Sequence, residues 1–518
     1  MVLGIASVIL IVFITTPIGG QPAPRQKNVI MMISDGFGPA SETFARQYHG
    51  WRENLVPRDN LLPLDTIHVG HSRTQSSSSL VTDSAAGATA FACALKSYNG
   101  AIGVDPDQLP CGTVLESAKI QHGMLTGLVA TSRITHATPA SFSAHVIDRN
   151  MENEIAVQQI GNLPLGRTVD LMFGGGLCEF LSNQTEGSCR TDDRDVLQEA
   201  KEEFGWNVYQ SRAEFDALTA TSAALPLMGL FAPQCLFVDR INTEIIVQHM
   251  SYEMDRVPSE QPSLKEMTHK ALSILGQATK DMDRGFFLMI EGSRIDMAAH
   301  TNDPAAHVHD IWQYHQTVEV VKKFVEEHPD TVVISTSDHE TGGFTLGRQL
   351  SEAYPEYKWN PEVISRVQNS SEVLALSWSD AIQQDVATRE YLENVLIRSG
   401  LGIDDPSEDE ISRVFQWQGT NKTTEELAYL FSDMVSRRAL IGWSTHGHTA
   451  VDVNLYAYGA RADELRGSHE NTEIGDFIVD YLDLDLQSIT KKLNKNAVFS
   501  NWFKRTEMRT ETKPHYHG

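Results

Sequence analysis

Short apolar runs that end in acidic, hydroxyl or glycine residues recur along the chain and constrain its fold more than any other feature. The run Asn28–Ile33 leads into Ser34, Asp35 and Gly36. Similar runs are Met124–Ala130, Val169–Phe173, Gly285–Ile290, Thr331–Ser335 and, after His448, Val451–Tyr458. Because they are mostly apolar, with little alternation between apolar and polar residues, they predict strands buried on both faces. With helical patterns between them, they predict an α/β fold of three layers, α/β/α, with a large, mostly parallel central sheet.

The segments between these runs carry helix signals. Thr113–Glu116 and Ser263–Glu266 match the capping box, in which a hydroxyl residue and a glutamate satisfy free N–H groups at a helix start. Apolar residues also follow a helical spacing between Pro304 and His328. In parallel sheets covered by helices, ligands bind beyond the carboxyl ends of the strands. Acidic residues and histidines occupy those ends here.

The 518 residues contain no internal repeat and no low-complexity linker. We therefore predict a single domain over residues 28–490, although a chain of this length has room for several. Residues 345–440 are more polar and are predicted to form an irregular elaboration over the sheet. Residues 491–518 are predicted to form a polar tail.

Small side chains surround one serine, Ser84, in the stretch Ser79–Ala90. Asp83 directly precedes it, and a helix-forming run follows. A serine at a helix start lies near free N–H groups and the positive end of the helix dipole, where anions bind. That placement suits a nucleophile that attacks a phosphoryl group, whereas the ordinary role of such a serine is to cap the helix. Ser84 lacks a Gly-x-Ser-x-Gly motif, so a hydrolase triad is not indicated.

Acidic residues and histidines occur in pairs near the predicted strand ends. The pairs are Asp296 with His300, Asp338 with His339, and His446 with His448. Each pair is common by chance, but together they indicate a metal centre, because mixed carboxylate and imidazole ligands suit zinc. Asp296 and His300, which would share one helical face, form one set with a histidine of the third pair. Asp338 and His339 form a second set with Asp35, completed by Ser84.

Three residues offer oxygen atoms alone, namely Asp35, Thr138 and Glu291, and such ligands suit magnesium. The formal net charge of −26 argues against nucleic acid as a partner, since phosphate backbones need basic patches. The same charge would repel an anionic substrate unless local cations reverse the field. Bound metal ions would supply those cations.

The first 24 residues carry no charged side chain, and most of Val2–Ile18 is apolar. Residues 1–20 are predicted to be a secretory signal peptide, with an uncleaved N-terminal anchor as the alternative. The end of the chain has no apolar tail for a lipid anchor. A secreted protein is therefore predicted, with a vacuolar or membrane-anchored location as the alternative.

Sequons and cysteines agree with a secretory route. The predicted glycosylation sites are Asn183, Asn369 and Asn421. The five cysteines allow two internal bridges, and the loops that they flank predict the disulfides Cys93–Cys111 and Cys178–Cys189. Cys235 is left over and is predicted to be buried.

Together these motifs resemble the alkaline phosphatase family, in the family's order, from Asn28 to about Tyr458. The matching stretches are Met32–Gly38, Val81–Ala90, His136–Ala140, Glu291–His300, Ser337–Glu340 and Gly447–Thr449. Thr82–Gly100 is most similar to fungal members. The resemblance implies a homodimer that hydrolyses a broad range of small phosphomonoesters at alkaline pH.

The resemblance also implies a role for each matching residue. Ser84 would be the nucleophile of a two-step in-line mechanism that passes through a phosphoserine and releases inorganic phosphate. Arg149, thirteen residues after His136, would hold the phosphate, and Asp83 would orient Arg149. Two Zn²⁺ and one Mg²⁺ are expected per chain. Their implied ligands are Asp296, His300 and His448 for the first zinc, Asp35, Asp338, His339 and Ser84 for the second, and Asp35, Thr138 and Glu291 for magnesium.

Some positions need a choice or depart from the family pattern. His448 is chosen over His446 because Gly447–Thr449 matches the family motif. His136 replaces the aspartate of bacterial members, and Met297 replaces their lysine, so the surroundings of the magnesium site match neither bacterial nor animal members. Without that lysine, phosphate is expected to be held more weakly. Gln261 replaces an aspartate of the calcium site in animal members.

Two other kinds of function fit parts of the pattern. A phosphodiesterase or sulfatase of the same superfamily would share the fold. The sulfatase motif is absent at Ser84, however, and a diesterase has no use for a second clamp such as Arg149. A secreted metal- or phosphate-binding protein without catalysis is the other alternative, and the complete ligand set argues against it.

Overall fold

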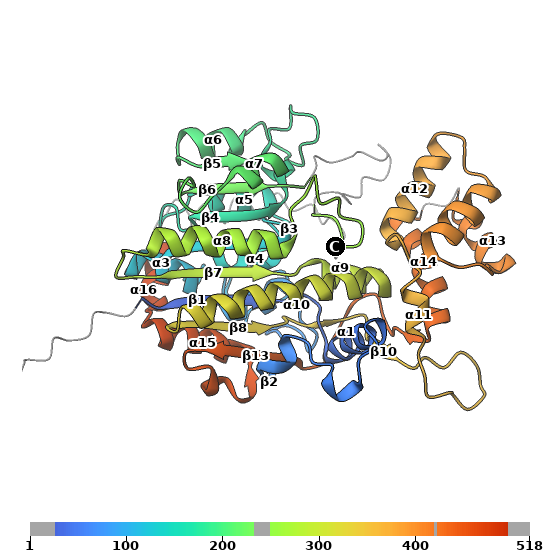
Figure 1. Cartoon of the computed structure of the whole chain (residues 1–518). Coiled ribbons are helices and arrows are strands. Elements are labelled where there is room, and N and C mark those ends of the chain that lie inside the picture. Colours follow the sequence, from blue (N-terminus) through green and yellow to red (C-terminus); the bar gives the residue numbers. More distant parts are fainter. Residues whose placement is uncertain (1–25, 233–248, 419–421, 496–518) are drawn as a thin grey trace, which may run out of the picture.

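The computed structural model describes residues 26–232, 249–418 and 422–495. Within these ranges one ten-stranded sheet has the order β14-β2-β13-β8-β1-β7-β3-β4-β6-β5 (Figure 1). Every pairing from β8 to β5 in that order is parallel. The predicted large, mostly parallel sheet is therefore confirmed.

The strands of this sheet are β1 (Asn28–Ile33), β2 (His68–Arg73), β3 (Leu125–Arg133), β4 (Leu171–Gly175), β5 (Asn207–Tyr209), β6 (Leu227–Leu230), β7 (Phe286–Glu291), β8 (Thr331–Thr336), β13 (Val453–Gly459) and β14 (Gly467–Glu470). Two short pairs lie outside it, β9 (Glu340–Thr341) with β12 (His448–Thr449) and β10 (Thr345–Leu346) with β11 (Ile441–Gly442). The helices are α1 (Pro39–Arg52), α2 (Ser84–Cys93), α3 (Val114–His122), α4 (Ala137–Ser143), α5 (Glu152–Gln159), α6 (Val196–Glu202), α7 (Arg212–Ala217), α8 (Leu264–Thr279), α9 (Arg294–His300), α10 (Pro304–Glu327), α11 (Pro361–Ile364), α12 (Ser371–Gln383), α13 (Glu408–Trp417), α14 (Thr424–Ala439), α15 (Asn471–Leu482) and α16 (Leu486–Asn494).

β1 shows how the sheet is buried on both faces. Ile30 and Met32 belong to a core that also contains apolar residues of α8 and α10, whereas Met31 and Ile33 belong to a core with residues of α3 and α15. Successive side chains of a strand point to opposite faces, so a strand that is apolar throughout needs helices on both sides. This arrangement confirms the three-layer fold.

β13 runs against its neighbours, since it pairs antiparallel with both β8 and β2. Its amino end therefore lies at the edge of the sheet where the parallel strands have their carboxyl ends. His448 comes shortly before β13, and the reversed direction of the strand carries it to that edge. The sequence predicted a strand here but not its direction.

The predicted helix starts are present. Thr113 and Ser263 form capping boxes with Glu116 and Glu266, and α10 begins at Pro304. Residues 345–440 differ from the irregular segment that the sequence predicted, because they contain α11 to α14 and the π-helix η4 (Tyr391–Gly400). These helices lie beyond the end of the sheet, on the side of α9 (Figure 1).

Both predicted disulfides, Cys93–Cys111 and Cys178–Cys189, are present. The predicted signal peptide, Cys235, Asn421 and the tail after residue 495 lie outside the described residues. In the part of the chain that the structure describes, no helix combines the length and apolar character needed to cross a membrane.

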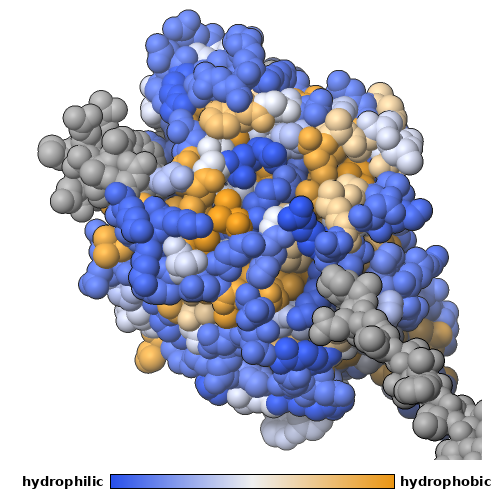
Figure 2. Space-filling model, turned by 90° about the vertical axis from the view of Figure 1, so that its left-hand side faces the viewer, coloured by the Kyte–Doolittle hydropathy of each residue, from blue (hydrophilic) through white to orange (hydrophobic). Residues whose placement is uncertain are grey.

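The amino ends of the parallel strands face the viewer in Figure 2, where mostly hydrophilic residues surround smaller hydrophobic patches. A pocket of about 590 Å³ opens beside these strand ends, with Lys27, Met124 and Gly285 in its lining. The acidic residues and histidines singled out in the sequence lie at the opposite end of the sheet, so this pocket is not part of their site.

Candidate active site

Several predicted ligands meet at one edge of the sheet because their strands end there. Asp35 follows β1, Glu291 is the last residue of β7, and Asp338 and His339 follow β8. All four side chains are fully buried. His448 joins them from the amino end of β13.

Ser84 is the first residue of α2, and Asp83 rather than Ser84 caps this helix. The Asp83 carboxylate accepts a hydrogen bond from the Ala86 N–H over 3.0 Å. The Ser84 hydroxyl is not used as the cap, and its Oγ lies 3.0 Å from Nε2 of His339. Small residues allow this approach, because a Cβ on Gly87 would lie 2.9 Å from Cβ of Asp338.

Asp296, His300 and His448 form the first set of candidate ligands. Nε2 of His300 lies 3.2 Å from the Asp296 carboxylate and 3.2 Å from Nε2 of His448. Nδ1 of His300 contacts the carbonyl of His446, and Nδ1 of His448 contacts the carbonyl of Thr82. Carbonyl oxygens only accept, so both Nδ1 atoms donate and both Nε2 atoms are directed at one point. Two imidazoles and a carboxylate so arranged suit a cation between them.

His446, the rival to His448, is turned away from this point. Its Nδ1 donates to the His300 carbonyl over 2.8 Å, and its ring stacks on Tyr429 with centroids 3.7 Å apart. The geometry therefore favours His448 as the member of the first set.

His339 lies at the centre of the second set. Its Nε2 is 3.3 Å from Asp338 Oδ2 and 3.4 Å from Asp35 Oδ1, in addition to the contact with Ser84. Its ring stacks on His448 with centroids 3.5 Å apart, so the first and second sets adjoin. Both carboxylate oxygens of Asp35 and Oδ2 of Asp338 have no hydrogen-bond partner among the described residues.

Asp35 also takes part in the third set. Asp35, His136 and Glu291 each offer a ligand atom, and these atoms lie within 4.8 Å of one another. Thr138, which was predicted with Asp35 and Glu291, lies in the first turn of α4. Within the described ranges, Thr138 Oγ1 and Glu291 Oε1 have no hydrogen-bond partner. The structure thus adds the imidazole of His136 to the predicted oxygen ligands.

The carboxylates of these sets are buried close to one another. Burial raises the pKa of Asp35 well above its usual value, and Asp338 and Asp296 raise it further. Burial likewise raises the pKa of Glu291 to about 8. Burial also acts to raise the pKa of Asp296, but the imidazoles of His300 and His448 hold it well below its usual range. Because buried charge is costly without a partner, this donor set fits divalent metal ions.

Arg149 and Asp83 lie together, as predicted. Nη1 of Arg149 donates to Asp83 Oδ2 over 3.2 Å, and Nη2 lies 3.1 Å from Nε2 of His136. A guanidinium has five N–H groups in a planar fork. Arg149 can therefore donate to an anion beside Ser84 while another of its N–H groups donates to Asp83, which orients the side chain.

Comparisons with known proteins agree with this geometry. Residues 26–484 match the sequence profile of the family described as Alkaline phosphatase. The chain belongs to the alkaline phosphatase family. The alkaline phosphatase of Schizosaccharomyces pombe is 48% identical over 471 residues, which cover 90% of this chain and 84% of that protein. The repressible alkaline phosphatase of Saccharomyces cerevisiae is 43% identical over 515 residues, which cover 95% and 87%.

Solved alkaline phosphatases share the fold. The cold-active enzyme from Shewanella sp. is 30% identical with a TM-score of 0.70, and the match covers 88% of this chain and 99% of that one. The Thermus thermophilus enzyme is 26% identical with a TM-score of 0.72, and the match covers 92% and 96%. The predicted family and its similarity to fungal members are confirmed, and the chain is a phosphomonoester hydrolase of a metal-dependent family.

Sequence patterns did not single out Thr341, which contacts two of the candidate ligands. Its Oγ1 donates to Asp296 Oδ1 over 2.5 Å and lies 3.2 Å from Nδ1 of His339. Thr341 therefore orients a carboxylate of the first set and the imidazole of the second. The sequence feature that could have indicated a role for Thr341 is its position two residues after His339.

Met297 has neighbours that the alkaline phosphatase pattern did not predict. Its Sδ lies 3.1 Å from Nη1 of Arg294, and its side chain clusters with Tyr252. The Arg294 guanidinium lies 3.5 Å above the Tyr252 ring and pairs with Glu372. The weaker binding of phosphate expected without a lysine at position 297 stays a prediction.

Proposed function

We propose that this alkaline phosphatase hydrolyses phosphomonoesters through a phosphoserine at Ser84, with two Zn²⁺ and one Mg²⁺ and an alkaline pH optimum. One observation carries the proposal. Ser84 Oγ lies at the start of α2, 3.0 Å from Nε2 of His339, among buried carboxylate oxygens that lack hydrogen-bond partners within the described residues.

The donor sets support the choice of metals. Asp296, His300 and His448 would hold the first zinc, and the other zinc would take Asp35, Asp338, His339 and Ser84, since carboxylate and imidazole ligands together suit zinc. Asp35, Thr138 and Glu291 offer the oxygen ligands that magnesium prefers, with His136 beside them. When bound, such ions lower the pKa of an attacking oxygen and neutralise charge on a transferred phosphoryl group.

The residues of the chain perform the remaining steps. Ser84 Oγ gives up its proton and attacks phosphorus, the ester P–O bond opposite it breaks, and the leaving oxygen takes up a proton and departs as the alcohol. Water then attacks phosphorus from the vacated side, the bond from phosphorus to Ser84 Oγ breaks, and Ser84 regains its proton as inorganic phosphate departs. Arg149 and the free N–H groups at the start of α2 hold the phosphoryl oxygens, and Asp83 orients Arg149.

The proposal extends to partners and location. Small phosphomonoesters with varied leaving groups are the substrates, nucleic acid is not bound as such, and the active form is a homodimer. The two disulfides support a secretory route, with a secreted product and a vacuolar or membrane-anchored one as the alternative.

The test is phosphate release by the purified protein from an aryl phosphate, with a bis-aryl phosphodiester and an aryl sulfate as controls. The monoester is expected to be the preferred substrate at alkaline pH. Chelation should abolish the activity, and zinc with magnesium should restore it. Preference for the diester or the sulfate, or activity that survives complete removal of metal, contradicts the proposal.

A further inference from the structure

Two segments that are far apart in the sequence lie antiparallel beside one another. We call residues 98–103 the Gly100 segment and residues 145–149 the Arg149 segment. Their hydrogen bonds run from Arg149 N–H to Gly100 C=O (2.9 Å), from Tyr98 O–H to Ile147 C=O (2.9 Å), from Ile102 N–H to Val146 C=O and from Val146 N–H to Ile102 C=O (3.0 Å each), and from His145 Nδ1–H to Gly103 C=O (2.6 Å). The Arg149 segment is therefore hydrogen-bonded to the Gly100 segment from His145 to Arg149.

Gly100 also joins these segments to the residue before the nucleophile. Its N–H donates to Asp83 Oδ2 over 2.9 Å, and its carbonyl accepts from the Arg149 N–H. The same Asp83 oxygen accepts from the Arg149 guanidinium over 3.2 Å. Gly100 has a φ of +92°, which L side chains rarely adopt. One glycine residue thus links the Asp83 carboxylate to the backbone of Arg149.

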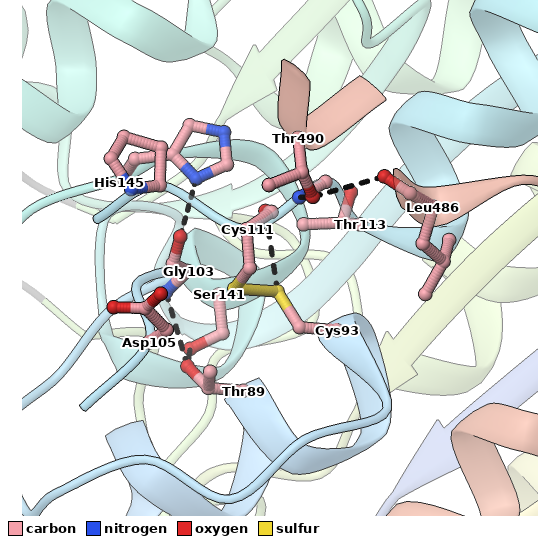
Figure 3. The surroundings of a disulfide bond; sticks show 12 residues. Thr89, Cys93, Gly103, Asp105, Cys111, Thr113, Ser141, His145, Leu486 and Thr490 are labelled. Atoms are coloured by element: carbon pink, nitrogen blue, oxygen red, sulfur yellow. Dashed lines mark hydrogen bonds between the residues drawn. A yellow bond between two sulfur atoms is a disulfide. The ribbon is translucent and has the colours of Figure 1, made fainter. Parts of the chain in front are cut away.

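The Cys93–Cys111 disulfide closes the stretch of chain that contains the Gly100 segment. Figure 3 shows the disulfide between Cys93, the last residue of α2, and Cys111. The Cys111 N–H donates to the Gly103 carbonyl over 3.0 Å. Thr89, in the middle of α2, accepts from the Gly103 N–H over 3.1 Å. The Gly100 segment is thereby fixed to the nucleophile helix at the middle and at the end of that helix.

A cross-link of this kind restricts how far the enclosed chain can move. The Gly100 segment forms no helix or strand of the main sheet. Besides its bonds to the Arg149 segment, it is held by α2 and lies within the stretch that the disulfide closes. Bidentate binding of phosphate requires an arginine held close to its productive geometry, and a displacement of about 1 Å is costly. Because the two segments are hydrogen-bonded, a displacement of the Gly100 segment would also displace the backbone of Arg149.

We infer that the Cys93–Cys111 disulfide is a positioning element for Arg149 and acts through the Gly100 segment. The inference rests on the proposed role of Arg149 in holding phosphate. Removal of the disulfide should weaken the binding of phosphate and of substrate. The metal-binding sets should be spared, because their residues lie on other elements and on the first turn of α2.

The test compares Cys93→Ser/Cys111→Ser with Cys178→Ser/Cys189→Ser, a matched variant that removes the other disulfide. The measurements are the inhibition constant of inorganic phosphate, KM and kcat for an aryl phosphate, metal content and Tm. The first variant should raise the inhibition constant and KM by about tenfold while kcat and metal content are kept. The second should lower Tm without changing phosphate affinity. Unchanged phosphate inhibition in the first variant, or equal changes in both, overturns the inference.

A double-mutant cycle with Arg149→Ala tests whether the disulfide affects phosphate affinity through Arg149. If the disulfide acts through Arg149, its removal changes phosphate affinity no further once Arg149 is absent, and additive losses overturn the inference. An Arg149→Ala variant that binds phosphate as the wild type does would instead overturn the proposed role of Arg149, and the inference with it.

Tyr98→Phe repeats the test without touching the disulfide and applies even if the double cysteine variant fails to fold. It removes the hydroxyl that donates to the Ile147 carbonyl. Phosphate inhibition should weaken by about two- to threefold, again only when Arg149 is present. Unchanged inhibition contradicts the inference.

Discussion

His300 and His446 hold each other through a reciprocal pair of hydrogen bonds. Nδ1–H of His300 donates to the carbonyl of His446 over 2.5 Å, and Nδ1–H of His446 donates to the carbonyl of His300 over 2.8 Å. Tyr429 of α14 stacks on the His446 ring, and its hydroxyl donates to Glu425. His446 thus orients a proposed zinc ligand and ties it to the helices that the sequence predicted as an irregular elaboration.

His446→Ala keeps the backbone carbonyl that accepts from His300 Nδ1 and removes the Nδ1–H that donates to the His300 carbonyl. It is expected to weaken zinc retention by about two- to tenfold, the usual effect of losing one hydrogen bond. The measurement is zinc content after dialysis against graded chelator concentrations. His446→Asn is the matched control, because its amide N–H can replace Nδ1–H. Retention equal to wild type in His446→Ala would show that the reciprocal pair has no influence on the metal.

Ser84→Ala should lower phosphomonoesterase activity by about 10³-fold or more, since the attacking oxygen is lost. Among the described residues, His339 is the one hydrogen-bond partner of Ser84 Oγ, and the Asp83 cap does not depend on this oxygen, so Tm should stay close to wild type. Phosphoenzyme trapped at low pH should yield a labelled peptide that contains Ser84. Label recovered on another residue would contradict the assignment.

Much of the fold could be predicted because its signals are local. The apolar residues of β1 specify a buried strand, and Pro304 with the spacing after it specifies α10. The direction of β13 was not predictable, because an apolar run looks the same in either direction. The helices within 345–440 were missed, although Ser407 with Glu410 forms a capping box that starts α13.

The candidate site residues could be named from motif order and the family resemblance, but their distances and most of their contacts could not be derived from the sequence. Ser84 and His339 are 255 residues apart, and only the fold brings them within 3.0 Å. The roles of Thr341 and Gly100 depend on positions in space that no spacing along the chain reveals. The contact between Met297 and Tyr252 was not predicted, because Tyr252 lies in a segment without a recognised motif.

Two sequons within the described residues differ in their surroundings. Asn183 and Thr185 are both exposed, in the loop that the Cys178–Cys189 disulfide closes. Asn369 is half-buried, and Ser371 of its sequon is buried at the start of α12. Asn183 is therefore the site from which a glycan can project freely into solvent.

Asn183→Gln should remove a glycan when the protein is made in a secretory host, and Asn369→Gln should leave the glycan pattern unchanged. The measurement is gel mobility before and after endoglycosidase treatment, with glycopeptide mass spectrometry to locate the sugar. A glycan found on Asn369 but absent from Asn183 would contradict the expectation from exposure.

His145 and Glu116 form a fully buried pair beside the Gly100 segment. Nε2 of His145 lies 2.9 Å from Glu116 Oε1, and Nδ1 lies 2.6 Å from the Gly103 carbonyl. The carbonyl only accepts, so Nδ1 donates to it, and a carboxylate acceptor beside Nε2 favours the imidazole that is protonated on both nitrogens. Burial acts to lower the pKa of His145, but the Glu116 carboxylate and its hydrogen bond raise it above the usual value.

A group whose pKa is raised by folding stabilises the folded state below its unfolded pKa, and this stabilisation is lost as pH rises through the folded pKa. The contribution of His145 should therefore be complete below about pH 6.5 and decline on the alkaline side, where the enzyme is proposed to work. Each unit by which the pKa is raised contributes about 1.4 kcal/mol to the free energy of unfolding at low pH. His145→Gln should thus destabilise the protein most at pH 6, and its deficit in Tm relative to wild type should shrink toward pH 9, with metal ions saturating in both proteins. A deficit that stays constant across this range would show that His145 does not titrate as the buried pair requires.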